Sequence, residues 1–408
     1  MKNQKKKTAI QIVNDMGIGY NLGNSFDSYN LSIKINSADE QITLFGNPIP
    51  TKKLIRNIKK YGFKTIRFPV TWINFIDDLG NVNSDWMSRV KEVVDWIIQS
   101  NLYCILNIYY DGGKGNWLSE GIQSRNKFIN LWKQIAEKFK DSSEYLIFES
   151  MHKVLYMNNY YEYDFITLFN FSQTFVDTIR NSGGNNLKRL LIISGAESNF
   201  DYTCSTKYKM PIDPFNMLAV SIDYYIPNNF VSTTLKYPWS YVDKWGTDKY
   251  YNELLANFDT MKKYFVSKGI PIIIGEVGVL TEEKKDLSSI REYLYSFFSI
   301  SFENDGIMSC LWDTSNKNYG NMNYYNRLSN EWYDEKIKNI IYDISRGKFI
   351  KSSDFYIMTN LETVSTLNDY GGFTIKLGNR NPVKIILNVK ITGGRLDGNE
   401  FGIKFYNL

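Results

Sequence analysis

The chain has 408 residues, of which 43% are hydrophobic and 16% aromatic, enough to bury one large core. The net charge of +5 is modest, and no basic stripe carries the interleaved aromatic residues typical of nucleic-acid binding, so we expect no nucleic-acid partner. Three widely spaced cysteines and a single histidine argue against a disulfide framework, a metal cluster and Ser-His or Cys-His catalysis. We therefore expect no metal and no other cofactor.

The N-terminus begins with the basic segment MKNQKKK, and we interpret residues 1–15 as a disordered, solvated arm. The residues that follow contain no apolar run of signal-peptide length, and no later run is long and apolar enough to span a bilayer. Either the protein is not exported through a cleaved leader, or a leader has been removed. The sequence does not give the compartment or the oligomeric state.

Short apolar runs alternate with longer amphipathic stretches between residues 16 and 350. Most runs are rich in Val and Ile and lack strict alternation, which is typical of parallel strands covered on both faces. The predicted strands are Met16–Gly23, Lys64–Thr71, Cys104–Asp111, Tyr145–His152, Arg189–Gly195, Leu218–Tyr225, Pro271–Gly278 and Gly306–Asp313.

The amphipathic stretches predict helices between these strands. They are Ser84–Ser100, with Ser84 as its N-cap, Gln123–Lys140, Tyr161–Ser182, Lys249–Lys268 and Lys284–Glu303. Residues 196–216 show no convincing helix, and a loop is expected there. Eight strands, each followed by a helix or a loop, predict an α/β fold, a (β/α)8 barrel over residues 16–350.

The pattern changes after residue 350. The segments FYIMTNL, FTIKLGN, VKIILNVKI and FGIKFYN are typical of strands separated by turns. Because such a short segment is marginal as an independent domain, we interpret residues 351–408 as a small β-rich appendage or as the start of a further module.

The active site of such a barrel lies at the C-terminal ends of its strands. Four segments at these ends are NLGNSFD at 21–27, GFKTIRFPVTW at 62–72, YLIFESMHK at 145–153 and PIIIGEVG at 271–278. In order and spacing they resemble glycoside hydrolase family 5, the cellulase and endo-β-glucanase family. The resemblance covers about residues 16–344 and leaves the C-terminal segment unexplained.

The resemblance implies retaining hydrolysis by two carboxylates about 5–5.5 Å apart, one the nucleophile and the other the general acid/base. Glu276 matches the nucleophile, and Arg67 matches the arginine that keeps that carboxylate ionised. Tyr225 matches a tyrosine that also contacts the nucleophile. Trp312 matches the aromatic floor on which the sugar stacks.

Other positions depart from the family. Lys153 stands where the family has its acid/base glutamate, and His152 replaces the asparagine that holds the sugar's 2-hydroxyl. A histidine expected after the third strand is replaced within Tyr109-Tyr110, of which Tyr110 is the candidate substrate-binding residue. Asp223 replaces a histidine after the sixth strand. The family residues that this chain has replaced lie on the side of the site where the resemblance places the acid/base glutamate.

Lys153 cannot replace the glutamate chemically. A carboxylate at Glu276 would raise the pKa of the lysine, and such an ammonium is a weak acid that cannot become a base. We therefore expect Lys153 to contact and neutralise Glu276 across the barrel mouth, because the fourth and seventh strands face each other in the family. We also expect Trp312 to remain an aromatic platform, with Trp72, Trp117, Trp239 and Trp245 as weaker candidates.

Three functions remain open at this point. The first is a catalytically impaired or inactive homologue that binds β-glucan or a related polysaccharide. The second is an active glycosidase with altered residues, in which Asp223 compensates for the lost glutamate. The third is a structural, surface or virion protein that uses the barrel as a scaffold.

Overall fold

The computed structural model describes residues 7–30, 32–109, 122–153, 162–233, 240–281, 285–315, 322–349 and 351. The chain divides into two units, Met1–Ser352 and Ser353–Leu408. The predicted β-rich appendage falls on the second unit, which lies outside the described residues. No helix within the described ranges combines the length and the apolar character that a membrane span requires.

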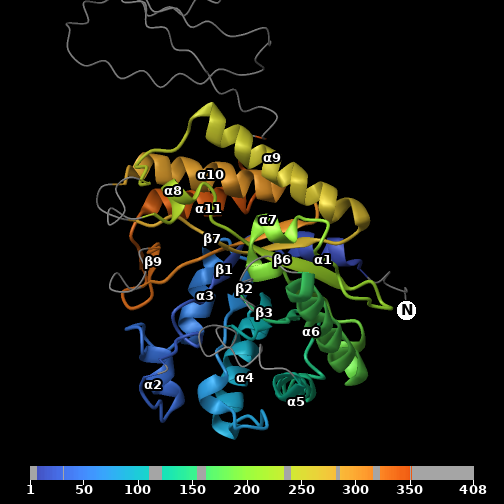
Figure 1. Cartoon of the computed structure of the whole chain (residues 1–408). Helices are drawn as coiled ribbons and strands as arrows, with labels where there is room; N and C mark the ends of the chain where they lie inside the picture. The colour runs from blue at the N-terminus through green and yellow to red at the C-terminus, as the bar shows by residue number, and fades with distance from the viewer. Residues whose placement is uncertain are drawn as a thin grey trace, which may run out of the picture. The chain divides into compact units, whose positions relative to one another are not determined.

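Eight parallel strands form a closed barrel in the order of the sequence. Figure 1 shows strands of this barrel, such as β1, β2 and β3, in the middle of the helices. This confirms the predicted (β/α)8 architecture, and every predicted strand contains an observed one. The strands are β1 (Gly19–Asn21), β2 (Thr65–Phe68), β3 (Tyr103–Asn107), β4 (Leu146–Glu149), β5 (Leu191–Ser194), β6 (Leu218–Tyr224), β7 (Ile272–Val277) and β8 (Ile307–Leu311). Every strand residue is buried, which explains why the strands lack polar alternation.

The strands are shorter than predicted, and the residues lost at their C-terminal ends lie at the barrel mouth. β2 ends at Phe68 because Pro69 follows and has no N–H to continue the ladder. β4 ends at Glu149, three residues before the predicted end at His152. The residues just beyond the strands do not have to keep the alternating side-chain directions of a strand. Their side chains can therefore point into the barrel mouth.

Helices surround the barrel, with α4, α5 and α6 toward the bottom of the view and α9, α10 and α11 toward the top (Figure 1). They are α2 (Ala38–Thr43), α3 (Lys52–Lys60), α4 (Ser84–Gln99), α5 (Ile122–Lys138), α6 (Glu162–Asn181), α9 (Asp248–Tyr264), α10 (Leu287–Glu303) and α11 (Glu335–Ile344). The five predicted helices are present. The N-cap of α4 is Asn83 and not Ser84, because the Asn83 side chain accepts the N–H groups of Asp85 and Trp86.

Several short elements lie between the barrel strands and the main helices. After β5 the segment expected to be a loop holds only a 3-10 turn, Ala196–Ser198, and the four-residue α7 (Phe200–Thr203). The four-residue α8 (Asn228–Val231) follows β6. A small hairpin, β9 (Tyr325–Asn326) with β10 (Glu331–Trp332), precedes α11.

The prediction of a disordered arm over residues 1–15 is wrong for its second half. Ala9–Met16 forms α1, with a capping box at Thr8. Its apolar face, Ala9, Ile12, Val13 and Met16, is buried in one core cluster with side chains from inside the barrel, among them Tyr103, Leu190, Met217 and Met308. The four apolar residues are spaced for one helix face, and their burial outweighs the charge of the preceding lysines.

Candidate active site

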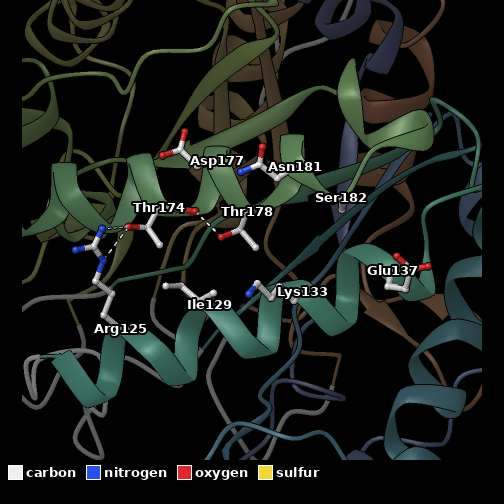
Figure 2. Close-up of a pocket in the computed structure, with 9 residues that line it drawn as sticks. All are labelled: Arg125, Ile129, Lys133, Glu137, Thr174, Asp177, Thr178, Asn181 and Ser182. Carbon is white, nitrogen blue, oxygen red and sulfur yellow. Dashed lines mark hydrogen bonds between the residues drawn. The ribbon is translucent and has the colours of Figure 1, made fainter.

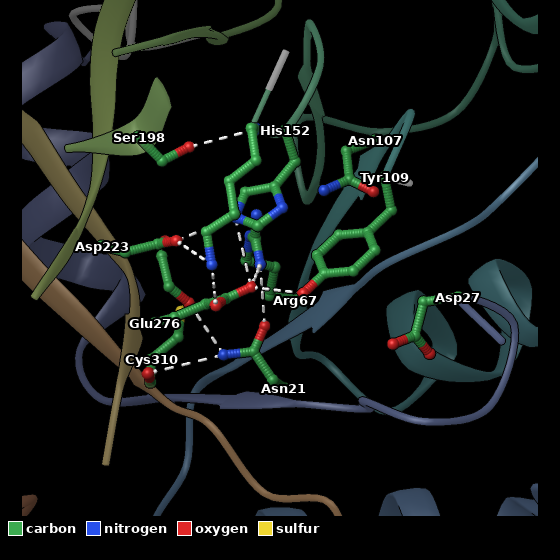
Figure 3. Close-up of polar contacts among 12 residues, drawn as sticks. Asn21, Asp27, Arg67, Asn107, Tyr109, His152, Ser198, Asp223, Glu276 and Cys310 are labelled. Carbon is green, nitrogen blue, oxygen red and sulfur yellow. Dashed lines mark hydrogen bonds and ion pairs between the residues drawn. The ribbon is translucent and has the colours of Figure 1, made fainter. Parts of the chain in front are cut away.

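Polar side chains from five strands converge at the C-terminal end of the barrel, and Figure 3 shows most of them. All site residues predicted from the sequence that fall within the described ranges lie at this end of the barrel. They are Arg67 in β2, His152 and Lys153 after β4, Asp223 in β6, Tyr225 after β6, Glu276 in β7 and Trp312 after β8. Tyr110 lies outside the described residues.

Arg67 is fully buried and holds two carboxylates from opposite sides of the barrel. Its main partner is Glu149, which accepts from Nε at 2.8 Å and from Nη2 at 3.1 Å. Its Nη1 lies 3.3 Å from Oε1 of Glu276. Gly275 makes room for the guanidinium, since a Cβ there would lie 3.3 Å from Arg67 Cζ. The bidentate pair fixes the arginine, and the arginine then orients Glu276.

Glu276 is 1% exposed, and both of its oxygens are occupied. Oε1 accepts from the Tyr109 hydroxyl at 2.7 Å and from Arg67, and His152 Nε2 lies 3.2 Å away from it. Oε2 accepts from the Tyr225 hydroxyl at 3.0 Å and from Lys153 Nζ at 3.3 Å. The carboxylate is therefore held from five directions.

These contacts fix the charge of the pair. Burial acts to raise the pKa of Glu276, but Lys153, His152 and Arg67 outweigh it and hold that pKa well below its ordinary value. Burial acts to lower the pKa of Lys153, but Asp223 and Glu276 outweigh it and raise that pKa. Glu276 is consequently an anion and Lys153 a cation at neutral pH.

Lys153 bridges two carboxylates, as the sequence predicts for one of them. Its Nζ lies 3.0 Å from Asp223 Oδ2 and 3.3 Å from Glu276 Oε2. The backbone at Lys153 has a φ of +48°, a left-handed conformation that is uncommon for residues other than glycine. Its side chain is 49% exposed, whereas those of Asp223 and Glu276 are 6% and 2% exposed.

Asp223 and Glu276 lie side by side on neighbouring strands. Their Cα atoms are register partners between β6 and β7, and the register shifts between Ile222 and Asp223. A shift of register in a ladder, as at a β-bulge, often redirects a side chain beside an active site. Asp223 Oδ2 also lies 3.0 Å from His152 Nε2. The two carboxylates and the imidazole thus form one compact group.

Three nearly parallel rings line the mouth. Tyr109 stacks on His152 with ring centroids 4.4 Å apart and on Trp312 with centroids 5.8 Å apart. Trp312 is partly buried and packs closely against Gly23, where a Cβ would approach the indole to 2.9 Å. The sequence singled out the Tyr109-Tyr110 pair, but it did not predict that the Tyr109 hydroxyl donates to Glu276. Barrel position alone could have indicated it, since Tyr109 comes two residues after β3.

The weaker tryptophan candidates do not add platforms within the described region. Trp72 is fully buried and donates to the Asn107 carbonyl, and Trp245 is 5% exposed and packs edge-on against Tyr293. Both are packing residues. Trp117 and Trp239 lie outside the described residues.

Asp27 is a further buried acid near the mouth (Figure 3). It is 4% exposed and accepts the backbone N–H groups of Asn24 and Ser25 at 2.9 and 2.7 Å. Burial raises the pKa of Asp27 to about 6, although these hydrogen bonds act in the opposite direction. No sequence pattern indicates this rise in the pKa of Asp27, because burial depends on the fold.

A groove elsewhere on the barrel lies between α5 and α6 and carries no comparable chemistry (Figure 2). Its polar groups include Arg125, which donates to Thr174 Oγ1 at 2.8 and 3.1 Å. Lys133 and Asp177 are exposed side chains on its two walls. We assign no function to it.

Comparison with known proteins places the chain in a family. The family model described as cellulase (glycosyl hydrolase family 5) matches residues 23–318. Endoglucanase A of Clostridium longisporum is 33% identical over 356 residues, which are 82% of this chain and 65% of that protein, so the chain spans slightly less than two thirds of that relative. Endoglucanase A of Paenibacillus barcinonensis is 31% identical over 83% of this chain and 90% of its own length.

Solved structures agree. A GH5-4 broad-specificity endoglucanase from an uncultured bovine rumen ciliate is 52% identical and superposes with a TM-score of 0.81, covering 84% of this chain and 99% of that one. A GH5-4 broad-specificity endoglucanase from Clostridium longisporum is 30% identical, with a TM-score of 0.76 over 84% of this chain and 99% of that one. The chain belongs to glycosyl hydrolase family 5.

Proposed function

We propose that this protein is a family 5 barrel that binds β-glucan and hydrolyses it slowly or not at all. The observation that carries the proposal is Lys153. At the position where the family motif has its acid/base glutamate, its ammonium lies 3.0 Å from Asp223 and 3.3 Å from Glu276.

Retaining hydrolysis needs a group that protonates the leaving oxygen and then activates water. Lys153 carries a raised pKa because of Asp223 and Glu276, although burial opposes the shift, so it is a poor proton donor and is not available as a base. General acid/base assistance contributes about 10²–10⁴-fold to such reactions. Losing it leaves unactivated glucan nearly inert.

Glu276 retains the properties of a nucleophile in part. It is ionised, but its two oxygens accept from Arg67, Tyr109, Tyr225 and Lys153. Attack on a sugar requires one oxygen to leave these partners. A substrate with a good leaving group needs no acid in the first step and could still form a glycosyl-enzyme on Glu276.

Asp223 is poorly suited to restore activity. It neighbours Glu276 on the next strand instead of facing it across a scissile bond. Its Oδ2 is also engaged by both His152 and Lys153 at 3.0 Å. To act as the acid, Asp223 would have to carry a proton that it can give to the leaving group. Its Oδ2 is instead positioned to accept hydrogen bonds from His152 and Lys153.

Binding is supported by the aromatic surface that remains. Trp312 keeps a partly accessible ring beside Tyr109, and aromatic faces with polar rims suit sugar rings. A family 5 lichenase mutant from Caldicellulosiruptor sp. F32, 27% identical to this chain with a TM-score of 0.75, was solved in complex with cellotetraose. We therefore use cellotetraose as the probe.

The test combines calorimetric titration with cellotetraose and reducing-sugar release from a panel of β-glucans. We expect saturable binding that weakens by about tenfold or more in Trp312→Ala, whereas Tyr342→Ala, an exposed aromatic on α11, leaves it unchanged. Hydrolysis should be negligible, and intact mass should reveal an adduct on Glu276 only with an activated glycoside. Robust turnover that Glu276→Gln abolishes would overturn the loss of catalysis. Absence of any binding would overturn the glucan assignment.

A further inference from the structure

Three metal-ligating side chains meet at the barrel mouth. They are His152 after β4, Asp223 in β6 and Glu276 in β7, and their ligand atoms all lie within 4.8 Å of one another. His152 Nε2 lies 3.0 Å from Asp223 Oδ2 and 3.2 Å from Glu276 Oε1. All three are buried, with exposed fractions of 3%, 8% and 1%. Figure 3 shows them pointing toward one another.

The imidazole has too few protons for this arrangement. A neutral imidazole carries one N–H, and an ionised carboxylate only accepts. Nε2 therefore has at most one proton for Asp223 and Glu276. If the proton is on Nδ1, Nε2 faces Asp223 Oδ2 and Glu276 Oε1 with no hydrogen between them. Lys153 then donates to Asp223, and Tyr109 and Arg67 donate to Glu276 Oε1. In that tautomer all three ligand atoms can bind one cation.

The buried charge also accommodates a divalent cation. Arg67, Lys153 and His152 are the groups that face the carboxylates of Glu149, Asp223 and Glu276. With Lys153 turned out to solvent, a divalent ion in its place and His152 neutral as a ligand, three positive charges still meet three negative ones. Half of the Lys153 side chain is already exposed, so it can leave without crossing packed core.

We propose that His152, Asp223 and Glu276 bind a divalent transition-metal ion, with Lys153 as the internal cation that the metal displaces. One imidazole nitrogen and two carboxylates suit Zn²⁺. Tyr109, Tyr225 and Arg67 already bond to Glu276 and would orient it as a ligand. This inference is independent of whether the protein hydrolyses glucan.

The direct test is calorimetric titration of the chelator-treated full chain with Zn²⁺, alongside the visible absorption of bound Co²⁺. We expect one ion per chain. His152→Ala and Asp223→Asn should each weaken binding by about tenfold or more, and Lys153→Met should tighten it because the competing ammonium is gone. The matched control is Asp177→Asn on the exposed face of α6, which should leave the titration unchanged.

A second readout uses the unaltered protein, so it does not depend on whether a variant folds. His152 is the chain's single histidine, and its ¹⁵N-labelled ring gives one pair of nitrogen resonances. Zn²⁺ should shift Nε2 strongly at one equivalent. Failure of the wild-type chain to take up Zn²⁺, uptake only after Lys153→Met, or uptake that leaves the His152 resonances in place would each overturn the proposal.

Discussion

Replacing Lys153 by Met tests whether the internal cation stabilises the barrel mouth. The change removes an ammonium 3.0 Å from Asp223 and 3.3 Å from Glu276 and keeps an unbranched side chain. Removing one partner of a fully buried ion pair costs about 3–5 kcal/mol, and an exposed pair contributes about 0.2–1 kcal/mol. Because the side chain is 49% exposed, water screens the pair, and we expect a loss between these limits, about 1–3 kcal/mol at pH 7.

The loss should depend on pH with a defined sign. Burial acts to raise the pKa of Glu276, but Lys153 and the other cations hold it below its ordinary value. A carboxylate of this kind stabilises the fold above its unfolded pKa and loses that contribution as pH falls. Lys153 has a raised pKa, so its contribution is complete at neutral pH and is lost only under strongly alkaline conditions. The difference between wild type and variant should therefore be full near pH 7 and shrink below about pH 4.

Urea denaturation followed by tryptophan fluorescence measures this difference at pH 7 and pH 3.5. EDTA in the buffer prevents a metal ion from replacing the lost ammonium. Lys133→Met, at an exposed position on α5, is the matched control and should change the free energy of unfolding by less than about 0.5 kcal/mol. A Lys153→Met protein as stable as the wild type at pH 7 would refute the view that Lys153 neutralises a buried anion.

Three further predictions concern stability. Arg67→Met should lower the free energy of unfolding by about 3–5 kcal/mol in urea denaturation, because Glu149 would remain buried without its bidentate partner; a smaller loss than in the Lys153 variant would contradict this. Burial raises the pKa of Asp27 to about 6, so the folded state keeps the Asp27 proton to a higher pH than the unfolded chain does. The free energy of unfolding of the wild type should therefore fall by about 3 kcal/mol as pH rises from about 4 to about 6. Asp27→Asn should flatten that dependence, and an unchanged slope would exclude Asp27 as its cause. Asp286→Ala should lower the melting temperature by the equivalent of about 1 kcal/mol, because Asp286 accepts the N–H of Ser289 at the start of α10; no change would mean that the cap is redundant.

The strands could be predicted from the sequence because burial on both faces leaves continuous runs of Val and Ile, as in PIII at Pro271–Ile274. The ends of the strands could not be predicted in the same way. A strand stops where its ladder of hydrogen bonds stops, and the apolar pattern does not mark that residue. The contact between Lys153 and Glu276 was predictable because strand ends converge in a barrel. The helix at Ala9–Met16 was missed because two turns of apolar spacing follow a strongly basic segment.

The inner arrangement of the site depended on side-chain directions that no motif states. The resemblance indicated that Arg67 would hold Glu276, but its stronger partner is Glu149, which it reaches across β3. The Tyr109 hydroxyl and the grouping of His152 with Asp223 arise from rotamers and from a register shift between β6 and β7. Contacts between side chains of separate strands form only when the barrel closes, so no single sequence segment encodes them.

The N-terminal helix has a consequence for synthesis. Asn14 in α1 donates to Asp305, 291 residues later, and β1 pairs with β8. At about 5–20 residues per second, the ribosome needs on the order of 15–60 s to supply those partners. During that interval the apolar side chains of Ile12, Val13 and Met16 have no barrel interior to enter. In the nascent chain these apolar side chains must therefore stay unburied until β8, the last barrel strand, has been synthesised.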